Sequence, residues 1–260
     1  MTVTTEGATT APPADDAPVL FELVDVHAGY EQFKALFGVN LTVRRGRATA
    51  LIGSNGAGKT TVARVASGLV APTSGTLRLD GNDVTGKKAF ELARLGISHA
   101  PEGRSVFSSL TVEENLALSF RQAKVSSGLK GALDQSYALF PRLGERRRQN
   151  AGSLSGGEQR MLTLARVLVL EPRLLIADEL SLGLAPIITT EVYVVLERIL
   201  ESGTSLLVVE QHLDHALGVA HEVVALERGE VAFCGRPDQL DTTGNFFLSG
   251  GADVSATSNN

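Results

Sequence analysis

The chain has 260 residues, of which 43% are hydrophobic and 20% are charged, and its 24 Lys and Arg against 29 Asp and Glu give a formal net charge of −5. This composition is typical of a globular protein and excludes wholesale disorder and fibrous folds. The acidic balance disfavours a sequence-blind nucleic-acid binder, which needs a basic surface. The longest strictly apolar run, from Val192 to Leu196, is far shorter than the roughly 20 residues of a membrane-spanning helix.

The two ends of the chain differ from its body. Residues 1–18 and 249–260 are small, polar or acidic without a hydrophobic period, so we expect disordered tails there. No Lys or Arg precedes Lys34, which disfavours a signal or transit peptide. A single cysteine, Cys234, excludes an internal disulfide framework and fits a reducing compartment. The cytoplasm is therefore the expected location.

Short strand-like runs alternate with helical patterns through most of the body, which predicts an α/β fold with a largely parallel sheet. The runs cover residues 20–26, 39–43, 48–52, 76–79, 97–100, 174–177, 206–209 and 223–226. Residues 111–170 contain no such run and predict consecutive helices. Two capping boxes mark helix starts in this stretch, Thr111 with Glu114 and Ser155 with Glu158. A hairpin turn is expected at residues 227–230.

A glycine-rich segment between the strand-like run 48–52 and a helical run fits the phosphate-binding pattern G-x-x-x-x-G-K-[ST]. Glycines allow successive backbone N–H groups to point at phosphate oxygens, and the following helix presents its positive end to the same anion. Lys59 would bind the β- and γ-phosphates, and the Thr60 hydroxyl is a suitable Mg²⁺ ligand. The candidate nucleotide-binding residues are Gly53, Ser54, Asn55, Gly56, Ala57, Gly58, Lys59, Thr60 and Thr61.

Two acidic residues, Asp178 and Glu179, follow the apolar run 174–177. A nucleotide site that uses Mg²⁺ needs a carboxylate at the end of a neighbouring strand. Asp178 is the candidate for the metal shell, and Glu179 is the candidate to orient or deprotonate the attacking water. The guanine-reading pattern N-K-x-D is absent, which disfavours a GTPase.

A second anion-binding helix end is expected at Ser155, Gly156 and Gly157, where two glycines follow a capping serine. The segment Leu-Ser-Gly-Gly-Glu-Gln at 154–159 resembles the signature of ATP-binding cassette (ABC) ATPases. The resemblance covers nearly all of residues 19 to about 240 and implies one nucleotide-binding domain at 19–248. Its P-loop NTPase fold would have a RecA-like core sheet, an antiparallel β part and a helical subdomain inserted at about 107–170. It also implies a head-to-tail dimer, in which ATP and Mg²⁺ lie between the phosphate loop of one subunit and the signature of the other.

Four further positions take their meaning from the resemblance. Tyr30 occupies the place of the aromatic ring that stacks on adenine. Glu102 replaces the glutamine that senses the γ-phosphate and Mg²⁺, and a glutamate there can still bind the metal. Gln211 replaces the usual switch histidine, although the neighbouring His212 remains an alternative. Ala185 stands where the family often has an aspartate.

The segments Pro-Glu-Gly-Arg at 101–104, Leu-Gly-Leu-Ala-Pro at 182–186 and Val-Glu-Gln at 209–211 resemble one subgroup, the second cassette of branched-chain amino acid importers. This implies an ATPase that drives uptake of such solutes through separate transmembrane permease subunits. The chain would pair with a second cassette and reach the cytoplasmic face of the membrane only through the permease, without binding nucleic acid. A lipid or polysaccharide exporter and a non-transport ABC ATPase remain alternatives.

Overall fold

The computed structural model describes residues 17–103, 105–121, 128–211 and 213–240. The tails expected at 1–18 and 249–260 therefore lie almost wholly outside the described residues, and so do Arg104 and His212. The described chain begins at Ala17, whose carbonyl oxygen accepts a hydrogen bond of 2.8 Å from the Arg44 guanidinium.

The strands form two sheets. A six-stranded sheet has the order β10-β9-β3-β8-β7-β6, and a four-stranded antiparallel sheet has the order β2-β1-β4-β5. The first consists of β10 (Glu230–Gly235), β9 (Glu222–Glu227), β3 (Ala48–Ile52), β8 (Ser205–Glu210), β7 (Leu174–Asp178) and β6 (Ile97–Ala100). The second consists of β2 (Phe33–Arg44), β1 (Val19–Tyr30), β4 (Ser74–Leu79) and β5 (Asn82–Asp83).

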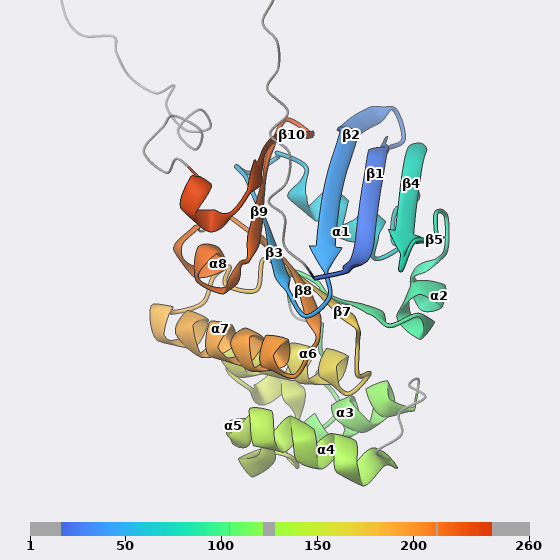
Figure 1. Ribbon diagram of the computed structural model, residues 1–260. Helices are drawn as coiled ribbons and strands as arrows, with labels where there is room; N and C mark the ends of the chain where they lie inside the picture. The colour runs from blue at the N-terminus through green and yellow to red at the C-terminus, as the bar shows by residue number, and fades with distance from the viewer. Residues whose placement is uncertain (1–16, 104, 122–127, 212, 241–260) are drawn as a thin grey trace, which may run out of the picture.

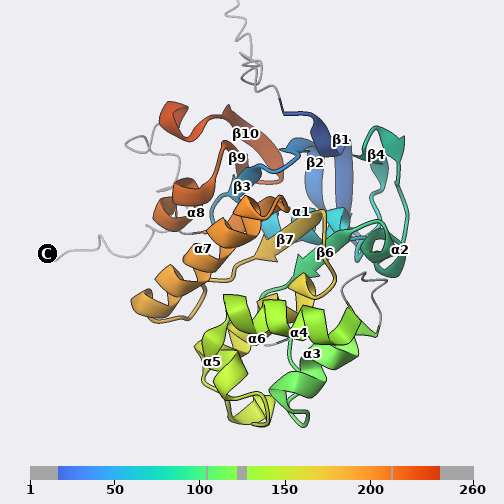
Figure 2. The ribbon, with the colours of Figure 1, turned by 60° about the horizontal axis from the view of Figure 1, so that its bottom comes forward.

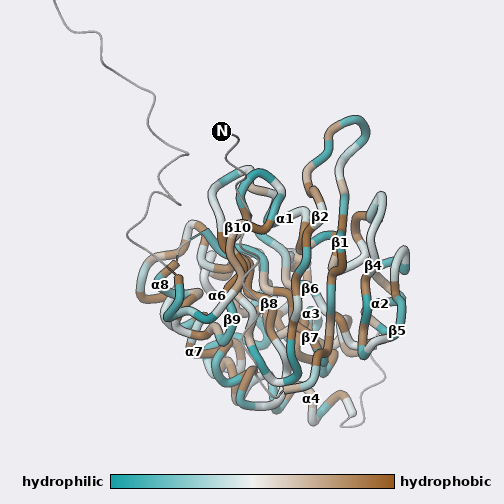
Figure 3. Tube along the Cα trace, turned by 45° about the horizontal axis from the view of Figure 1, so that its top comes forward, coloured by the Kyte–Doolittle hydropathy of each residue, from teal (hydrophilic) through white to brown (hydrophobic). Residues whose placement is uncertain are grey.

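Strands β9, β3, β8, β7 and β6 are parallel, and only β10 runs antiparallel, through the predicted hairpin at 227–230. Each strand-like run of the sequence is part of an observed strand. Strands β1 and β2 extend further than expected, to the hairpin that projects from the molecule in Figures 1 and 3. The predicted α/β fold class, with a largely parallel sheet and an antiparallel part, is confirmed.

Helices cover the parallel sheet and fill the long connection between β6 and β7. The helices are α1 (Lys59–Ala66), α2 (Ala89–Arg94), α3 (Val112–Phe120), α4 (Gly128–Leu139), α5 (Pro141–Glu145), α6 (Gly156–Leu168), α7 (Pro186–Glu201) and α8 (Leu213–Val219), with short 3₁₀ turns at Ala151–Ser153 and Pro237–Gln239. Helices α3, α4 and α5 lie below the sheet in Figure 1, away from the β1–β2 hairpin, and in Figure 2 the molecule is turned so that they come forward. Both predicted capping boxes are formed.

Two hydrophobic clusters lie on opposite faces of the parallel sheet. Along β7, Leu174 and Ile176 belong to the cluster shared with α1 and the antiparallel sheet, whereas Leu175 and Ala177 belong to the cluster under α6 and α7. This alternation follows from the two-residue period of a strand, and burial on both faces explains the nearly continuous apolar runs in the sequence. The strands are thereby held rigidly, with their carboxyl ends at one edge.

Candidate functional site

The phosphate loop connects β3 to α1, as the sequence predicts. Gly58 caps α1 with a φ of 105°, and a Cβ at this position would lie 2.9 Å from Leu36 Cδ2 and 3.0 Å from the Ala35 carbonyl oxygen. A glycine is required here because of both the left-handed backbone and the lack of space. The Ala57 N–H donates to the Ser54 carbonyl oxygen at 3.2 Å, which closes the loop into a compact turn. Asn55 and Gly56 are exposed at its rim, while Thr61 is buried in the helix.

Lys59 lies across this loop, with only 4% of its surface exposed. Its ammonium donates to the Ser54 carbonyl oxygen at 3.1 Å and lies 3.5 Å from Glu179 Oε1. One cation therefore links the phosphate loop to the acidic end of β7. This contact brings together two sets of residues that are 120 positions apart in the chain.

The acidic residues cluster because parallel strands end at the same edge of the sheet. Ile52 on β3 lies beside Glu210 on β8, and Asp178 on β7 lies beside Val209. Directly after β7, Glu179 adopts a left-handed φ of 47°, and its N–H donates to the Val209 carbonyl oxygen at 2.8 Å. That conformation is uncommon for a non-glycine residue and marks a sharply constrained turn.

Burial raises the pKa of Glu179 above that of an ordinary glutamate. The nearby Lys59 ammonium lowers this pKa in part, whereas the carboxylates of Glu102 and Asp178 raise it further. The site therefore gathers negative charge that a bound cation would relieve.

The surroundings of the Asp178 carboxylate fit the role of a magnesium ligand. It is 1% exposed, and its Oδ1 atom has no hydrogen-bond partner among the described residues. Its Oδ2 atom lies 3.6 Å from His99 Nε2 on the neighbouring strand β6. An unpaired buried carboxylate oxygen is costly unless it has a ligand, and Mg²⁺ prefers such oxygens. No group of three or more His, Cys, Asp or Glu residues in the described part of the chain could hold a metal alone, so nucleotide oxygens would complete the shell.

The signature turn begins α6. Ser155 is the N-cap: its hydroxyl accepts from the Glu158 N–H, and Glu158 Oε2 accepts from the Ser155 N–H at 2.9 Å. Ser155 and Gly156 are exposed, whereas Gly157 is buried, and a Cβ on it would lie 2.6 Å from Ile188 Cγ2 of α7. The turn thus presents Ser155 and Gly156 to solvent. No hydrogen bond or ion pair between described residues joins this turn to the phosphate loop.

The remaining predicted residues lie at three places. Tyr30 ends β1 with 40% of its surface exposed, and its hydroxyl accepts a hydrogen bond of 3.2 Å from Arg64 of α1. Glu102 is exposed after β6 and is close enough to affect the pKa of Glu179. Gln211 is half-buried directly after β8.

Sequence reasoning missed a buried polar group beside these residues. Glu210, at the end of β8, is 2% exposed and accepts hydrogen bonds from Ser181. The sequence did contain an indication of this buried acid, because Glu210 directly follows an apolar run, as Asp178 does. Arg160 on α6 is also buried, and nothing in its sequence context indicates this.

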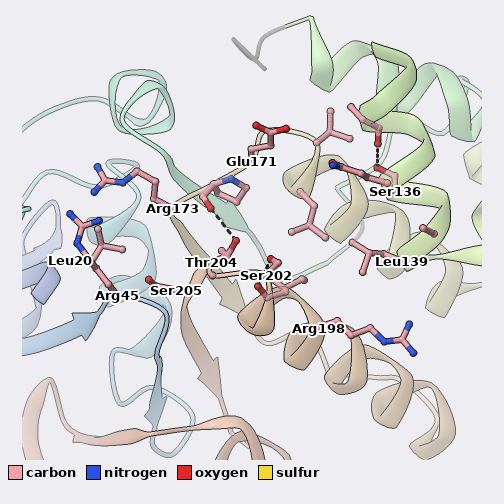
Figure 4. Close-up of a pocket in the computed structure, with 18 residues that line it drawn as sticks. Leu20, Arg45, Ser136, Leu139, Glu171, Arg173, Arg198, Ser202, Thr204 and Ser205 are labelled. Atoms are coloured by element: carbon pink, nitrogen blue, oxygen red, sulfur yellow. Dashed lines mark hydrogen bonds between the residues drawn. The ribbon is translucent and has the colours of Figure 1, made fainter. Parts of the chain in front are cut away.

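A cavity with a volume of about 630 Å³ lies elsewhere. It is formed at the opposite edge of the parallel sheet, where α4, the segment before β7 and the segment before β8 meet. Figure 4 shows that the guanidinium groups of Arg45 and Arg173 lie on one side of it and that of Arg198 on the other. Arg45 and Arg173 both form ion pairs with the Asp80 carboxylate, so these two guanidinium groups already have an acidic partner.

Within the described residues, no helix has the length and apolar character needed to span a bilayer.

Comparison with known proteins agrees with this geometry. The family model described as ABC transporter matches residues 36–181. The chain is 41% identical to the high-affinity branched-chain amino acid transport ATP-binding protein BraG of Pseudomonas aeruginosa, over 78% of this chain and 86% of that protein. It is 33% identical to the probable branched-chain amino acid transport ATP-binding protein LivF of Archaeoglobus fulgidus, over 85% of this chain and 94% of that protein.

Solved structures give the same result. The ATP-binding subunit of an ABC transporter superposes with a TM-score of 0.75 at 28% identity, over 84% of this chain and 90% of that one. The ADP conformation of an ABC transporter cassette superposes with a TM-score of 0.74 at 25% identity, over 84% and 91%. The phosphate loop, the acidic end of β7 and the signature turn thus occur in one P-loop NTPase fold, and the chain belongs to the ATP-binding cassette family of ABC transporters.

Proposed function

We propose that this chain is the ATP-hydrolysing subunit of an importer for branched-chain amino acids or related small solutes. The observation that carries the proposal is the contact between Lys59 and Glu179, because it places a phosphate-binding cation and a candidate general base 3.5 Å apart. Similarity to BraG and LivF supports the solute class. The permease would be a separate set of subunits, and through it the chain would lie at the cytoplasmic face of the membrane.

We assign a separate role in ATP binding and hydrolysis to each group of residues at the site. The loop 53–58 and the start of α1, with Thr60 and Thr61, would bind the phosphates, and Tyr30 would stack on adenine. Asp178, Thr60 and Glu102 are the candidate ligands of Mg²⁺, which would neutralise charge on the phosphate oxygens. Glu179 would orient or deprotonate the attacking water, and Gln211 would donate a hydrogen bond to the γ-phosphate.

A second cassette would complete the site. The exposed Ser155–Gly156 turn is a helix N-terminus that forms no hydrogen bond with the described phosphate loop of its own chain, so we propose that it binds ATP held by a partner. ATP would thereby join two cassettes, and hydrolysis would release them. The helical subdomain at about 107–170, together with the segment around Glu102, would be the surface that contacts the permease.

Expression of the tagged chain together with the genes that adjoin its own would test the transport role. Membrane permeases should co-purify, and the assembly reconstituted in liposomes should take up radiolabelled leucine only with ATP on the cassette side. Co-purification of a soluble scaffold or ribosome, or of a lipid-linked polysaccharide exporter, would instead support one of the alternative classes.

A further inference from the structure

The carboxylate of Glu210 is the most buried charge at this edge of the sheet that the proposed mechanism leaves unused. It belongs to the last residue of β8 and is 2% exposed. Burying a carboxylate is unfavourable unless hydrogen bonds or opposite charges compensate it. Its partners should therefore show why it is placed there.

Both carboxylate oxygens of Glu210 accept hydrogen bonds from Ser181, a residue of a different loop, while burial and then the nearby Glu210 carboxylate raise the pKa of the Tyr193 hydroxyl of α7. The Ser181 N–H donates to Oε1 at 3.1 Å, and the Ser181 hydroxyl donates to Oε2 at 2.9 Å. Ser181 is itself 6% exposed and lies two residues after Glu179. The pair thus fastens the loop that follows the candidate general base to the strand that precedes Gln211.

A third segment contributes the compensating charge. Arg160, on the signature helix α6, is 7% exposed and donates to the carbonyl oxygens of Pro101 at 3.4 Å and Gly103 at 2.7 Å. Burial lowers the pKa of Arg160, while the carboxylates of Glu102, Glu210 and Asp178 act in the opposite direction. The guanidinium therefore lies within the field of Glu210 while it holds the segment around Glu102.

We propose that Glu210 is a positioning residue for ATP hydrolysis, which fixes the Ser181 loop so that Glu179 and Gln211 keep a common geometry around the γ-phosphate. The inference rests on the proposed ATPase function of this site. Glu210 does not touch the nucleotide in this arrangement. It acts through Ser181 on one side and through its chain neighbour Gln211 on the other.

The same bonds predict which substitutions are tolerated. A glutamine at position 210 can accept from the Ser181 N–H through its carbonyl oxygen and donate to the Ser181 hydroxyl through its amide nitrogen. An alanine can do neither and leaves the Ser181 N–H without a buried acceptor. Glu210→Gln should therefore preserve the positioning, whereas Glu210→Ala and Ser181→Ala should impair it.

Steady-state ATPase kinetics of the full chain with Mg²⁺, alongside thermal unfolding, test the proposal. We expect Glu210→Ala to lower kcat about tenfold or more with KM for ATP changed less than about threefold, because positioning acts on the transition state rather than on binding. Ser181→Ala should lower kcat in the same direction. Glu210→Gln should stay within about threefold of the wild-type kcat.

Ser205→Ala is the matched control. Ser205 lies at the other end of β8, beside the cavity of Figure 4, and its hydroxyl accepts from the Gly46 N–H at 2.9 Å. Its loss should lower the Tm without changing kcat. The inference is overturned if Glu210→Ala changes kcat no more than Ser205→Ala does, if it raises only KM, or if Glu210→Gln is as impaired as Glu210→Ala. An inactive wild-type chain would instead contradict the proposed ATPase function.

Discussion

The ammonium of Lys59 lies 3.5 Å from the carboxylate of Glu179, and the two side chains are only 4% and 12% exposed. Each group is therefore the main opposite charge available to the other at this site. A γ-phosphate that binds Lys59 must compete with Glu179 for the cation. The ion pair therefore affects both the affinity for the nucleotide and the charge that surrounds Glu179, the candidate base.

Glu179→Gln should nearly stop hydrolysis while ATP binds at least as tightly as to the wild type. The amide keeps the shape of the side chain but cannot accept the proton of the attacking water, and it no longer competes for Lys59. A loss of about 100-fold or more in kcat is expected from the removal of a general base. ATPase assays and isothermal titration with Mg²⁺ and ATP measure both effects, and an ATP-dependent dimer should accumulate on size-exclusion. Hydrolysis at the wild-type rate would exclude Glu179 as the base.

Lys59→Ala should weaken ATP binding by about tenfold or more, since hydrogen bonds to charged groups contribute about 1.5–3 kcal/mol. Turnover should fall with it, because the phosphates are no longer held. Lys130→Ala on α4 is the control, because Lys130 is an exposed lysine far along the chain from the loop. Unchanged affinity together with unchanged turnover in Lys59→Ala would rule out the phosphate-loop assignment.

Gly156→Asp should block ATPase activity while ATP still binds to the single chain. Gly156 is exposed at the signature turn, so the new carboxylate would repel the γ-phosphate of a partner. Gly157 is less suitable, because a side chain there meets Ile188 of its own chain. Mixing Gly156→Asp with Lys59→Ala should restore some activity, because a mixed pair retains one intact composite site.

A disulfide trap gives the sharper test of that arrangement. Chains with Ser54→Cys should crosslink to chains with Gly156→Cys when both carry Glu179→Gln and Cys234→Ser and ATP is present. The same pair without ATP provides the baseline. If ATP produces no crosslink, the head-to-tail dimer is wrong.

Cys234 should react slowly with iodoacetamide in the native chain. Burial, and then the hydrogen bond and charge of Glu222, raise the pKa of this thiol to about 12. A raised thiol pKa leaves little of the reactive thiolate at pH 8. The rate should increase in guanidinium, and Glu222→Gln should increase it in the folded chain. Equal rates in native and unfolded protein would contradict this.

Local patterns predicted most of the fold. Apolar runs, capping boxes such as Thr111 with Glu114, and the 227–230 turn each depend on neighbours in sequence. The length of the β1–β2 hairpin did not follow from the sequence, because residues 27–30 and 33–36 lack a regular alternation and form strands by pairing with each other, with several shifts of register. The turn between β3 and α1 and the position of the acids after β7 also followed from the sequence, and their roles in ATP binding and hydrolysis stay predictions.

Polar contacts between residues far apart in the chain could not be predicted from the sequence. Glu210 and Ser181 are 29 positions apart, and Arg160 lies 57 positions from the Gly103 carbonyl it binds. Such contacts depend on where each strand ends relative to its neighbour, which no periodicity specifies. The burial of Gly157 could not be predicted either, because it depends on how closely α6 and α7 approach each other at Ile188.

The connection that contains α3 to α6 leaves the sheet after Ala100 and returns at Leu174, on adjacent strands paired in register. The route begins and ends at one border of the sheet, so β3, β8 and β9 keep their neighbours whatever length it has. The segment can therefore change in length or sequence, and with it the surface that we propose contacts the permease, without altering the pairing of β3, β8 and β9. The strand order thus makes the helical connection independent of the edge of the sheet at which Lys59 and Glu179 meet.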